Sequence, residues 1–300
     1  MTYSISCIVP TVGRSSVECT LAALERQTRP PDEIIVVRDS ERAGPAATRN
    51  RAILQAKGTF VACVDDDAIP PDDWLERLIE AQHRFGADVV GGTFEETDPL
   101  LMEIRRRRTY PAQVSLDNGG HVGNSGNIMY RRELLMQSRN DRGECFSTLF
   151  RTFGAEDWEL MMRLRANGAR VVYTPCTVQH LKRLTTSSYL RHQFKRGVGV
   201  ALLHRAYLKH PAPGFFQPSN LWSTERWFVV RYAKLLLRHI IGPFDVSSFR
   251  SLRNFLVFWV GSKAFALGYL QGRFIRIERL VAKRTSPGNF SKGTRELNLR

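Results

Sequence analysis

The chain has 300 residues, of which 43% are hydrophobic and 24% are charged, a balance that indicates a globular protein and excludes a disordered one. The net charge is +15, but residues 181–300 hold 22 Lys and Arg against 4 Asp and Glu. The first 180 residues are therefore slightly acidic and do not suit polyanion binding, whereas the basic remainder suits nucleic acid, an anionic membrane or an anionic acceptor.

The first 95 residues alternate between strand and helix patterns. Short apolar runs rich in β-branched residues predict strands over 5–9, 33–37, 59–64 and 87–92. Helices with apolar faces and capping residues are predicted over 17–24, 45–56 and 70–85, with Ser15 or Ser16 capping the first. This alternation predicts an α/β fold with an open, mainly parallel sheet, in which ligands bind beyond the carboxyl ends of the strands.

The middle of the chain is less regular. A Gly- and Asn-rich loop over 117–126 leads into a strand over 127–131, followed by a helix over 155–167. A strand over 170–174 is expected to stop at Pro175. The five cysteines are odd in number and lack CxxC spacing, so we expect reduced, buried thiols and a cytosolic protein.

Past residue 186 the chain becomes basic and helical. Residues 189–208, 222–241 and 252–274 are rich in aromatic and aliphatic side chains. In 254–270 the only charged residue is Lys263, yet this run is too short for a confident membrane span. It is a buried helix, an interfacial helix or a dimer contact, and the sequence leaves these three open. Residues 283–300 form a polar, basic tail.

Three consecutive aspartates, Asp65 to Asp67, follow the third predicted strand. Adjacent carboxylates repel one another unless a cation or hydrogen-bond donors offset their charge. Mg²⁺ and Mn²⁺ prefer such oxygen ligands and also bind phosphates. Taken alone, the triplet also fits a solvated acidic turn before a helix. Because Thr11 and Asp39 follow two other predicted strands, we expect three strand ends to share one crevice.

Six segments of the chain, in order, resemble motifs of the family 2 glycosyltransferases, inverting enzymes whose catalytic domain has the GT-A fold. They are Ile8-Val9-Pro10-Thr11 with Gly13-Arg14; Gln27-Thr28, Pro31 and residues 33–37 with Asp39; Ala47-Thr48-Arg49-Asn50; Gly58-Thr59-Phe60 with Asp65-Asp66-Asp67; Glu156-Asp157; and Gln193-Phe194-Lys195-Arg196-Gly197. Together they cover roughly the first 200 positions.

The resemblance implies a transfer of sugar from a nucleoside diphosphate sugar to an acceptor hydroxyl. Asp67, with help from Asp65 and with His180 as a further ligand, would hold Mn²⁺ or Mg²⁺ against the diphosphate. Asp157 would be the general base, with Glu156 as the alternative. His180 fits a capping or core histidine equally well.

The resemblance also implies residues that contact the two substrates. The donor-binding set is Pro10, Thr11, Arg14, Asp39, Arg49, Asp65, Asp66, Gln193 and Arg196. The set for the acceptor or the transferred sugar is Gly123, Asn124, Ser125 and Trp158. The chain departs from the family at Arg38-Asp39-Ser40-Glu41, where many members have two acidic residues and a Gly or Ser. Uridine is therefore only the default base.

These inferences predict a GT-A catalytic domain over 1–185, with a nucleotide-sugar half over 1–95 and an acceptor half over 96–185. A basic, apolar helical region over 186–282 and the tail over 283–300 follow it. The expected partners are a nucleotide sugar, a glycan or lipid-linked acceptor and an anionic membrane surface, with a homodimer left open and nucleic acid not expected. We expect a cytoplasmic enzyme, peripheral at the membrane. The alternatives are a nucleotidyltransferase on a related fold and a basic protein that binds nucleic acid or membrane.

Overall fold

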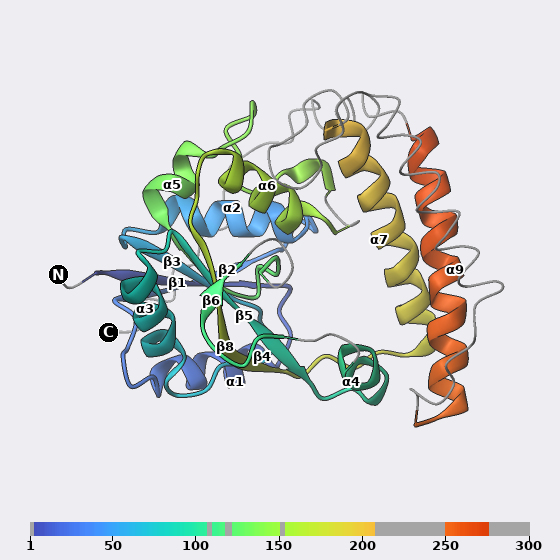
Figure 1. The fold of residues 1–300 in the computed structure, drawn as a ribbon, viewed down its shortest axis with the longest axis horizontal. Coiled ribbons are helices and arrows are strands. Elements are labelled where there is room, and N and C mark those ends of the chain that lie inside the picture. The colour runs from blue at the N-terminus through green and yellow to red at the C-terminus, as the bar shows by residue number, and fades with distance from the viewer. Residues whose placement is uncertain (1–2, 107–109, 118–121, 151–153, 208–249, 276–300) are drawn as a thin grey trace.

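The computed structural model describes residues 3–106, 110–117, 122–150, 154–207 and 250–275. A central sheet lies between two layers of helices, and a pair of long helices stands beside it (Figure 1). The strands are β1 (Ile5–Thr11), β2 (Glu33–Arg38), β3 (Phe60–Val64), β4 (Ala68–Ile69), β5 (Val89–Glu96), β6 (Ser115–Leu116), β7 (Asn127–Arg131) and β8 (Val171–His180). The helices are α1 (Val17–Glu25), α2 (Pro45–Gln55), α3 (Trp74–Phe85), α4 (Pro99–Arg106), α5 (Arg132–Gln137), α6 (Glu156–Ala166), α7 (Thr186–Tyr207) and α9 (Leu252–Phe274), with a 3₁₀ turn at η1 (Thr148–Phe150).

The sheet has the order β2-β1-β3-β7-β5-β8-β4, and β6 pairs with β8. β1 pairs in parallel with β2 and with β3, and β5 pairs in parallel with β8. β7 lies antiparallel between β3 and β5, so β1, β2, β3, β5 and β8 all run in one direction. The predicted α/β fold with its mainly parallel sheet is confirmed, although the inserted β7 makes the pairing mixed.

Each face of the sheet carries its own hydrophobic core, because alternate residues of a strand point to opposite faces. Ile8, Val61 and Cys63 belong to the core shared with α2, α5 and α6. Their neighbours Cys7 and Ala62 belong to the core that α1 and α3 cover. Burial also raises the pKa of the Cys7 and Cys63 thiols. The expectation of buried cysteines holds for four of the five and is wrong for Cys19, which is exposed on α1.

Three local predictions were wrong. β8 continues past Pro175 to His180, because its register against β5 shifts there and the missing proline N–H falls in the irregularity. β1 likewise runs through Pro10 to Thr11. Ser16 occupies the N-cap of α1 without a side-chain capping bond.

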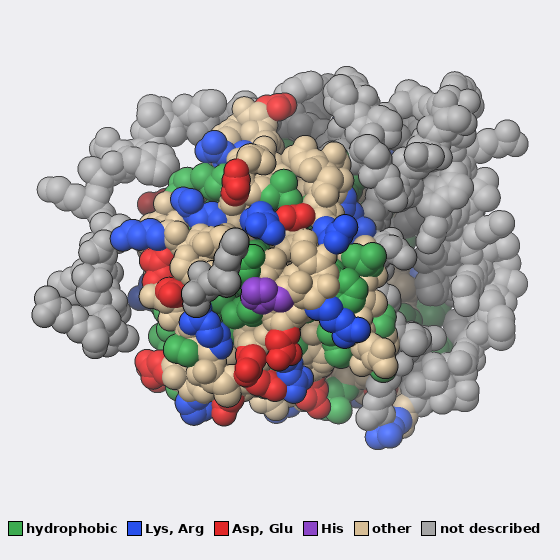
Figure 2. Space-filling model, turned by 60° about the vertical axis from the view of Figure 1, so that its left-hand side comes forward, with side chains coloured by type: hydrophobic (Ala, Val, Ile, Leu, Met, Phe, Trp, Pro, Cys, Tyr) green, Lys and Arg blue, Asp and Glu red, His purple; other side chains and the backbone are tan. Residues whose placement is uncertain are grey.

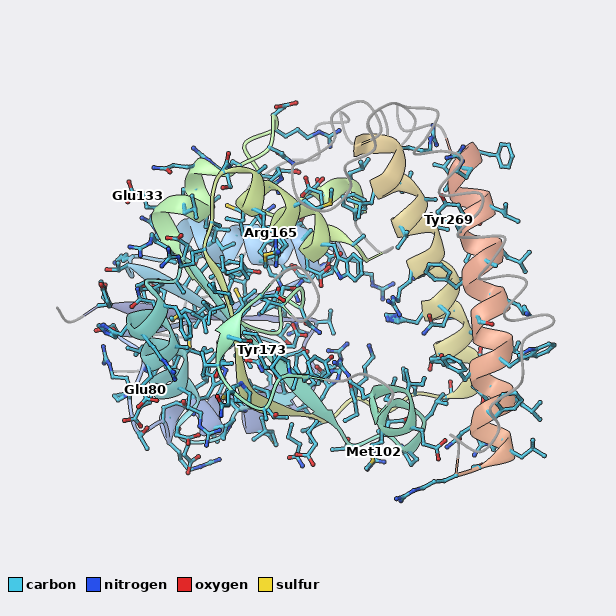
Figure 3. The ribbon with its side chains drawn as sticks, viewed as in Figure 1. Glu80, Met102, Glu133, Arg165, Tyr173 and Tyr269 are labelled. Atoms are coloured by element: carbon cyan, nitrogen blue, oxygen red, sulfur yellow. The ribbon has the colours of Figure 1, made fainter. Side chains whose placement is uncertain are left out.

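The predicted C-terminal helices are present over 186–207 and 252–274, whereas 222–241 and 283–300 lie outside the described residues. α9 runs parallel to α7 and packs on it through glycines. A Cβ at Gly268 would lie 1.9 Å from the Phe194 carbonyl oxygen, and one at Gly197 would lie 2.0 Å from that of Phe265. Tyr269 is buried in the same contact (Figure 3). α9 therefore packs against α7 with one face and is not buried on all sides.

None of the helices in the described part of the chain combines the length and apolar character that crossing a membrane requires. The division into a catalytic domain, a helical region and a tail stays a prediction.

Candidate active site

Asp66 organises the loop that leaves β1. Its carboxylate is 2% exposed and accepts hydrogen bonds from the Thr11 hydroxyl at 2.6 Å and from the Val12 N–H at 3.3 Å. It also pairs with the half-exposed guanidinium of Arg14, which lies 3.3 Å from Asp67 as well. The ends of β1 and β3 are therefore joined, as the sequence predicted, and Arg14 offsets part of the charge of the aspartate triplet.

Asp65 faces the other way, toward Arg49 of α2. The buried Arg49 guanidinium lies 2.8 Å from Asp65 and 3.5 Å from Glu156 at the start of α6. Burial alone would lower the pKa of Arg49, but these two carboxylates raise it above its ordinary value. One buried cation thus bridges the triplet after β3 and the acidic pair of α6, which are 91 positions apart in the chain.

Asp67 lies beside His180, the last residue of β8. The His180 Nε2 is 3.4 Å from Asp67, and its Nδ1 is 2.8 Å from Glu96 at the end of β5. Arg105 of α4 in turn pairs with Glu96 at 2.8 Å. Burial alone would lower the pKa of His180, but the hydrogen bonds and charges of the two carboxylates raise it to about 9. Burial would raise the pKa of Asp67, yet His180 holds it below its ordinary value.

The acidic pair Glu156-Asp157 begins α6, where the helix dipole favours negative charge. The preceding residues Gly154 and Ala155 both have positive φ, of 69° and 106°, and the value for Ala155 is strained. Burial, followed by the neighbouring charge of Glu156, raises the pKa of Asp157 to about 7, although Arg49 and backbone N–H groups oppose this. Asp157 is therefore poised to exchange a proton near neutral pH.

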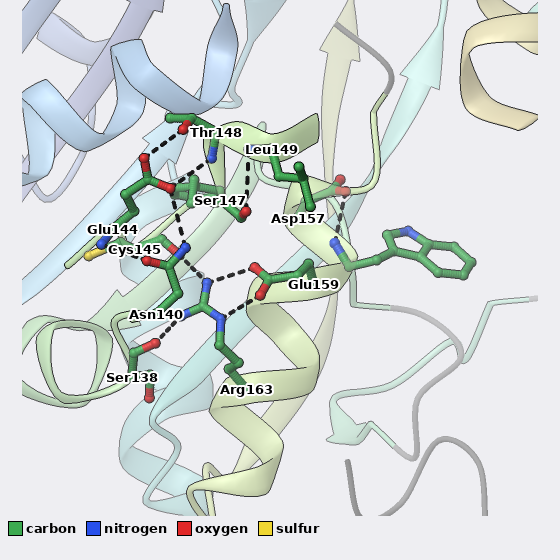
Figure 4. Close-up of polar contacts among 12 residues, drawn as sticks. Ser138, Asn140, Glu144, Cys145, Ser147, Thr148, Leu149, Asp157, Glu159 and Arg163 are labelled. Carbon is green, nitrogen blue, oxygen red and sulfur yellow. Dashed lines mark hydrogen bonds and ion pairs between the residues drawn. The ribbon is translucent and has the colours of Figure 1, made fainter. Parts of the chain in front are cut away.

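A network of hydrogen bonds and ion pairs holds α6 in place (Figure 4). Arg163 pairs with Glu159 at 2.7 Å and donates to the backbone carbonyls of Ser138 and Cys145. One turn above, the N–H of Trp158 donates to Asp157 at 2.9 Å. These contacts hold the first turn of α6 and the carboxylate of Asp157 in a set orientation.

The loop before β7 lies against both acidic groups. A Cβ at Gly126 would be 2.2 Å from the Asp65 carboxylate, so only glycine allows this approach. A Cβ at Gly123 would be 3.6 Å from the indole nitrogen of Trp158. Asn124 accepts a hydrogen bond from the N–H of Gly126, and Ser125 is buried. The four residues predicted to contact acceptor or sugar therefore lie together beside the triplet.

The other residues predicted to bind the sugar donor have no direct contact with the aspartate triplet among the described contacts. The carboxylate of Asp39 lies at the start of α2, where it accepts hydrogen bonds from the N–H groups of Ala43 and Gly44 at 2.8 and 2.9 Å. Gln193 and Arg196 contact each other on α7, and the Arg196 side chain passes 4.0 Å from a Cβ built at Gly154. Arg196 thus reaches the start of α6, whereas a role of Asp39 at the nucleotide stays a prediction.

The proposed cation site can be judged from its donor groups. Within the described ranges no three His, Cys, Asp or Glu side chains are gathered to hold a metal ion. The predicted trio is incomplete because Asp65 turns to Arg49. Asp67 and His180, however, fit a Mg²⁺ or Mn²⁺ site, since such ions need only one or two protein ligands when phosphates and waters complete the shell.

Sequence reasoning missed Glu96, Arg105 and the double role of Arg49. Glu96 follows the same rule as the aspartate triplet, because it ends a strand on the same side of the sheet. The strand was expected to stop at residue 92, so Glu96 was overlooked. Recognising that 89–96 could extend as one strand would have placed Glu96 at the crevice.

Comparison with known proteins shows which sequences and folds this chain resembles. The model of the glycosyl transferase family 2 matches residues 15–139, a segment that includes Arg49, the aspartate triplet and the loop before β7. Over these residues the chain is similar to glycosyl transferase family 2. Glu156, Asp157 and His180 lie beyond the matched segment, so their roles stay predictions.

Two relatives and one solved structure extend the comparison. Glycosyltransferase AglE of Haloferax volcanii is 37% identical over 68 residues, which span 23% of this chain and only 22% of AglE. Succinoglycan biosynthesis protein ExoM of Rhizobium meliloti is 24% identical over 215 residues, 70% of this chain and 68% of ExoM. Mannosyltransferase PcManGT of Pyrobaculum calidifontis, solved with GDP-Man and Mn²⁺, aligns over 91% of this chain and 88% of its own, with 14% identity and a TM-score of 0.58. This likeness confirms the predicted GT-A fold.

Proposed function

We propose that this chain is a family 2 glycosyltransferase that transfers a sugar from a nucleoside diphosphate sugar to a hydroxyl group of a glycan or lipid-linked acceptor, with inversion at the anomeric carbon and with a divalent cation. The observation that carries the proposal is the bridge that Arg49 makes between Asp65 and Glu156. This bridge brings the aspartate triplet close to the acidic pair of α6, and sugar transfer would require the donor diphosphate and a general base to lie close together in this way.

On the donor side, Asp67 and His180 would hold Mn²⁺ or Mg²⁺. Such an ion offsets the charge that develops on the leaving diphosphate. Glu96 fixes the His180 ring through Nδ1, and Arg14 and Arg196 add positive charge at the two sides of the crevice. The complex of PcManGT with GDP-Man and Mn²⁺ supports a donor and a metal of this kind.

On the acceptor side, Asp157 takes the proton of the attacking hydroxyl. The acceptor oxygen forms a bond to the anomeric carbon while the bond from that carbon to the diphosphate oxygen breaks, and the diphosphate leaves with the electron pair. Attack opposite the leaving group inverts the configuration. Trp158 and the Gly123 loop lie where they would line the sugar and acceptor positions.

Only the chemical class of the acceptor has support. ExoM is named for the biosynthesis of succinoglycan, a glycan, which agrees with a glycan or lipid-linked acceptor here. The basic C-terminal region agrees with work at the cytoplasmic face of a membrane.

A ligand panel tests the proposal. UDP- and GDP-sugars are titrated into the protein with Mn²⁺, with Mg²⁺ and with chelator, and donor binding is followed by calorimetry and thermal shift, since a bound ligand raises the melting temperature. We expect binding only with a divalent cation, and release of nucleoside diphosphate during turnover. Release of pyrophosphate would instead indicate nucleotidyl transfer, and cation-independent binding would contradict the metal site.

A further inference from the structure

One face of α9 exposes a stripe of large apolar side chains. Their exposed fractions run from 41% to 84%, and the residues are Leu252, Leu256, Val260, Leu267, Leu270 and Phe274. At 3.6 residues per turn these positions fall within an arc of about 80° along the whole helix. We call this set the leucine stripe. A row of this kind is more than the scattered exposed leucines that most proteins carry.

The stripe does not belong to the contact between α9 and α7. That contact is made by Gly261, Gly268 and Gly272, which lie about 140° around the helix from the centre of the stripe. Added Cβ atoms at these glycines would clash with α7, so the packed face of α9 is fixed by close backbone approach. The stripe is consequently held facing away from α7, and among the described elements α9 lies at the edge of the fold, on the far side of α7 from the sheet (Figure 1).

The charge around the stripe has one sign. α7 and α9 contain no Asp or Glu, and the cations on the two helices are Arg191, Lys195, Arg196, Arg205, Arg253, Lys263 and Arg273. Lys263 falls within the arc of the stripe, 4.8 Å over the Trp259 ring, and Arg253 is exposed beside it. The sheet domain differs, because acidic and basic side chains are interspersed on the face that Figure 2 shows.

We propose that the leucine stripe docks α9 onto the surface of an anionic lipid bilayer, lying in the plane of the interface. Apolar side chains on one face, with basic residues in and beside it, are the features that bind a helix to anionic headgroups. A second copy of the chain fits less well, because a two-fold contact would bring Arg253 and Lys263 of the two copies together.

Docking at this surface would also position the catalytic crevice. α7 packs on η1 and α6 through a cluster that includes Phe150, Ala155, Met162, Val198 and Leu202. Ala155 directly precedes the acidic pair, so α9, α7 and the catalytic base form one packed unit. This inference rests on the proposed function and narrows it: the acceptor is lipid-linked and is met at the bilayer surface.

Vesicle flotation of the full chain tests the inference, with phosphatidylcholine vesicles and vesicles that also contain phosphatidylglycerol. The wild type should float with the anionic vesicles only. The double variant Leu256→Glu/Leu267→Glu should bind them about tenfold less or weaker still. The matched control is Leu54→Glu/Leu116→Glu, which changes two leucines that are 64% and 53% exposed on the sheet domain and should bind as the wild type does.

A second variant guards against misfolding of the first. Arg253→Gln/Lys263→Gln keeps the stripe and should reduce the preference for anionic vesicles, with circular dichroism confirming the helices. Equal binding to neutral and anionic vesicles, or unchanged binding of the stripe variant, overturns the inference. So does a dimer in light scattering that the stripe variant abolishes while vesicles do not bind. Calorimetry of donor with Mn²⁺ on the same samples is independent of lipid, so its failure would sink the proposed function and leave the docking result standing.

Discussion

Substitution of Asp157 by asparagine tests the general base most directly. The pKa of Asp157 is raised to about 7 by burial and by Glu156, and only the ionised carboxylate can accept the proton of the acceptor hydroxyl. The transfer rate should therefore rise with pH through about 7 and be about tenfold below its plateau at pH 6. Asp157→Asn should bind donor and Mn²⁺ as the wild type does and lose transfer at every pH.

The same substitution has a second readout in stability. In the unfolded chain the pKa of Asp157 is near its ordinary value of 3.8, while in the folded chain it is about 7. The folded state therefore loses stability relative to Asp157→Asn as pH rises from about 4 to 7, and the difference is constant above that range. The full shift would correspond to about 4 kcal/mol, and partial exposure of the side chain reduces this to the order of 1–2 kcal/mol.

Urea unfolding of both proteins at pH 5 and pH 8, beside transfer kinetics from pH 5.5 to 8.5, would measure both effects. The asparagine variant should gain stability relative to the wild type between the two pH values. A rate that is flat across pH 7, or a variant that still transfers sugar, would remove Asp157 from the role of base.

Three further predictions concern the supporting residues. Glu96→Ala removes the carboxylate that contacts Nδ1 of His180 and should weaken Mn²⁺ binding, measured by electron paramagnetic resonance, by about 10–100-fold; unchanged affinity would make Glu96 merely structural. Arg49→Met leaves two carboxylates without their shared cation and should cost about 3–5 kcal/mol in urea unfolding, so near-wild-type stability would refute the bridge. Gly268→Ala forces a Cβ against Phe194 and should cost about 1–3 kcal/mol, whereas the exposed neighbour in Leu267→Ala should change stability little.

The sequence was sufficient to predict that the ends of β1 and β3 meet, because these strand ends follow a local rule. Asp65 to Asp67 end a strand whose pattern is unmistakable, and the alternation around them implies that strand ends meet. The position of Arg49 was predicted through family resemblance, but its bridge was not. A contact between α2 and α6 depends on how both helices pack on one face of the sheet, and no periodicity within either helix reports that.

Two features of the sheet could not be predicted from local sequence patterns, for a related reason. The strand at 127–131 was predicted, but its place between β3 and β5 follows from the global order of strands, which short-range alternation does not encode. The continuation of β8 past Pro175 depends on a register shift opposite Gly92, where a Cβ would lie 2.1 Å from the Cys176 carbonyl oxygen. His180 reaches Asp67 only because of that continuation.

The neighbours Glu156 and Asp157 are both acidic, but they contact different groups. One last substitution distinguishes their proposed roles. Glu156 pairs with Arg49, whereas the carboxylate of Asp157 accepts a hydrogen bond from the backbone N–H of Trp158. Because the charge of Glu156 helps to raise the pKa of Asp157, Glu156→Gln should lower that pKa and move the rise in transfer rate to lower pH, while transfer itself persists. Glu80→Gln, on the exposed side of α3, is the matched control and should leave the profile in place. If Glu156→Gln abolishes transfer at all pH values while donor binding is kept, Glu156 is the base and Asp157 its neighbour.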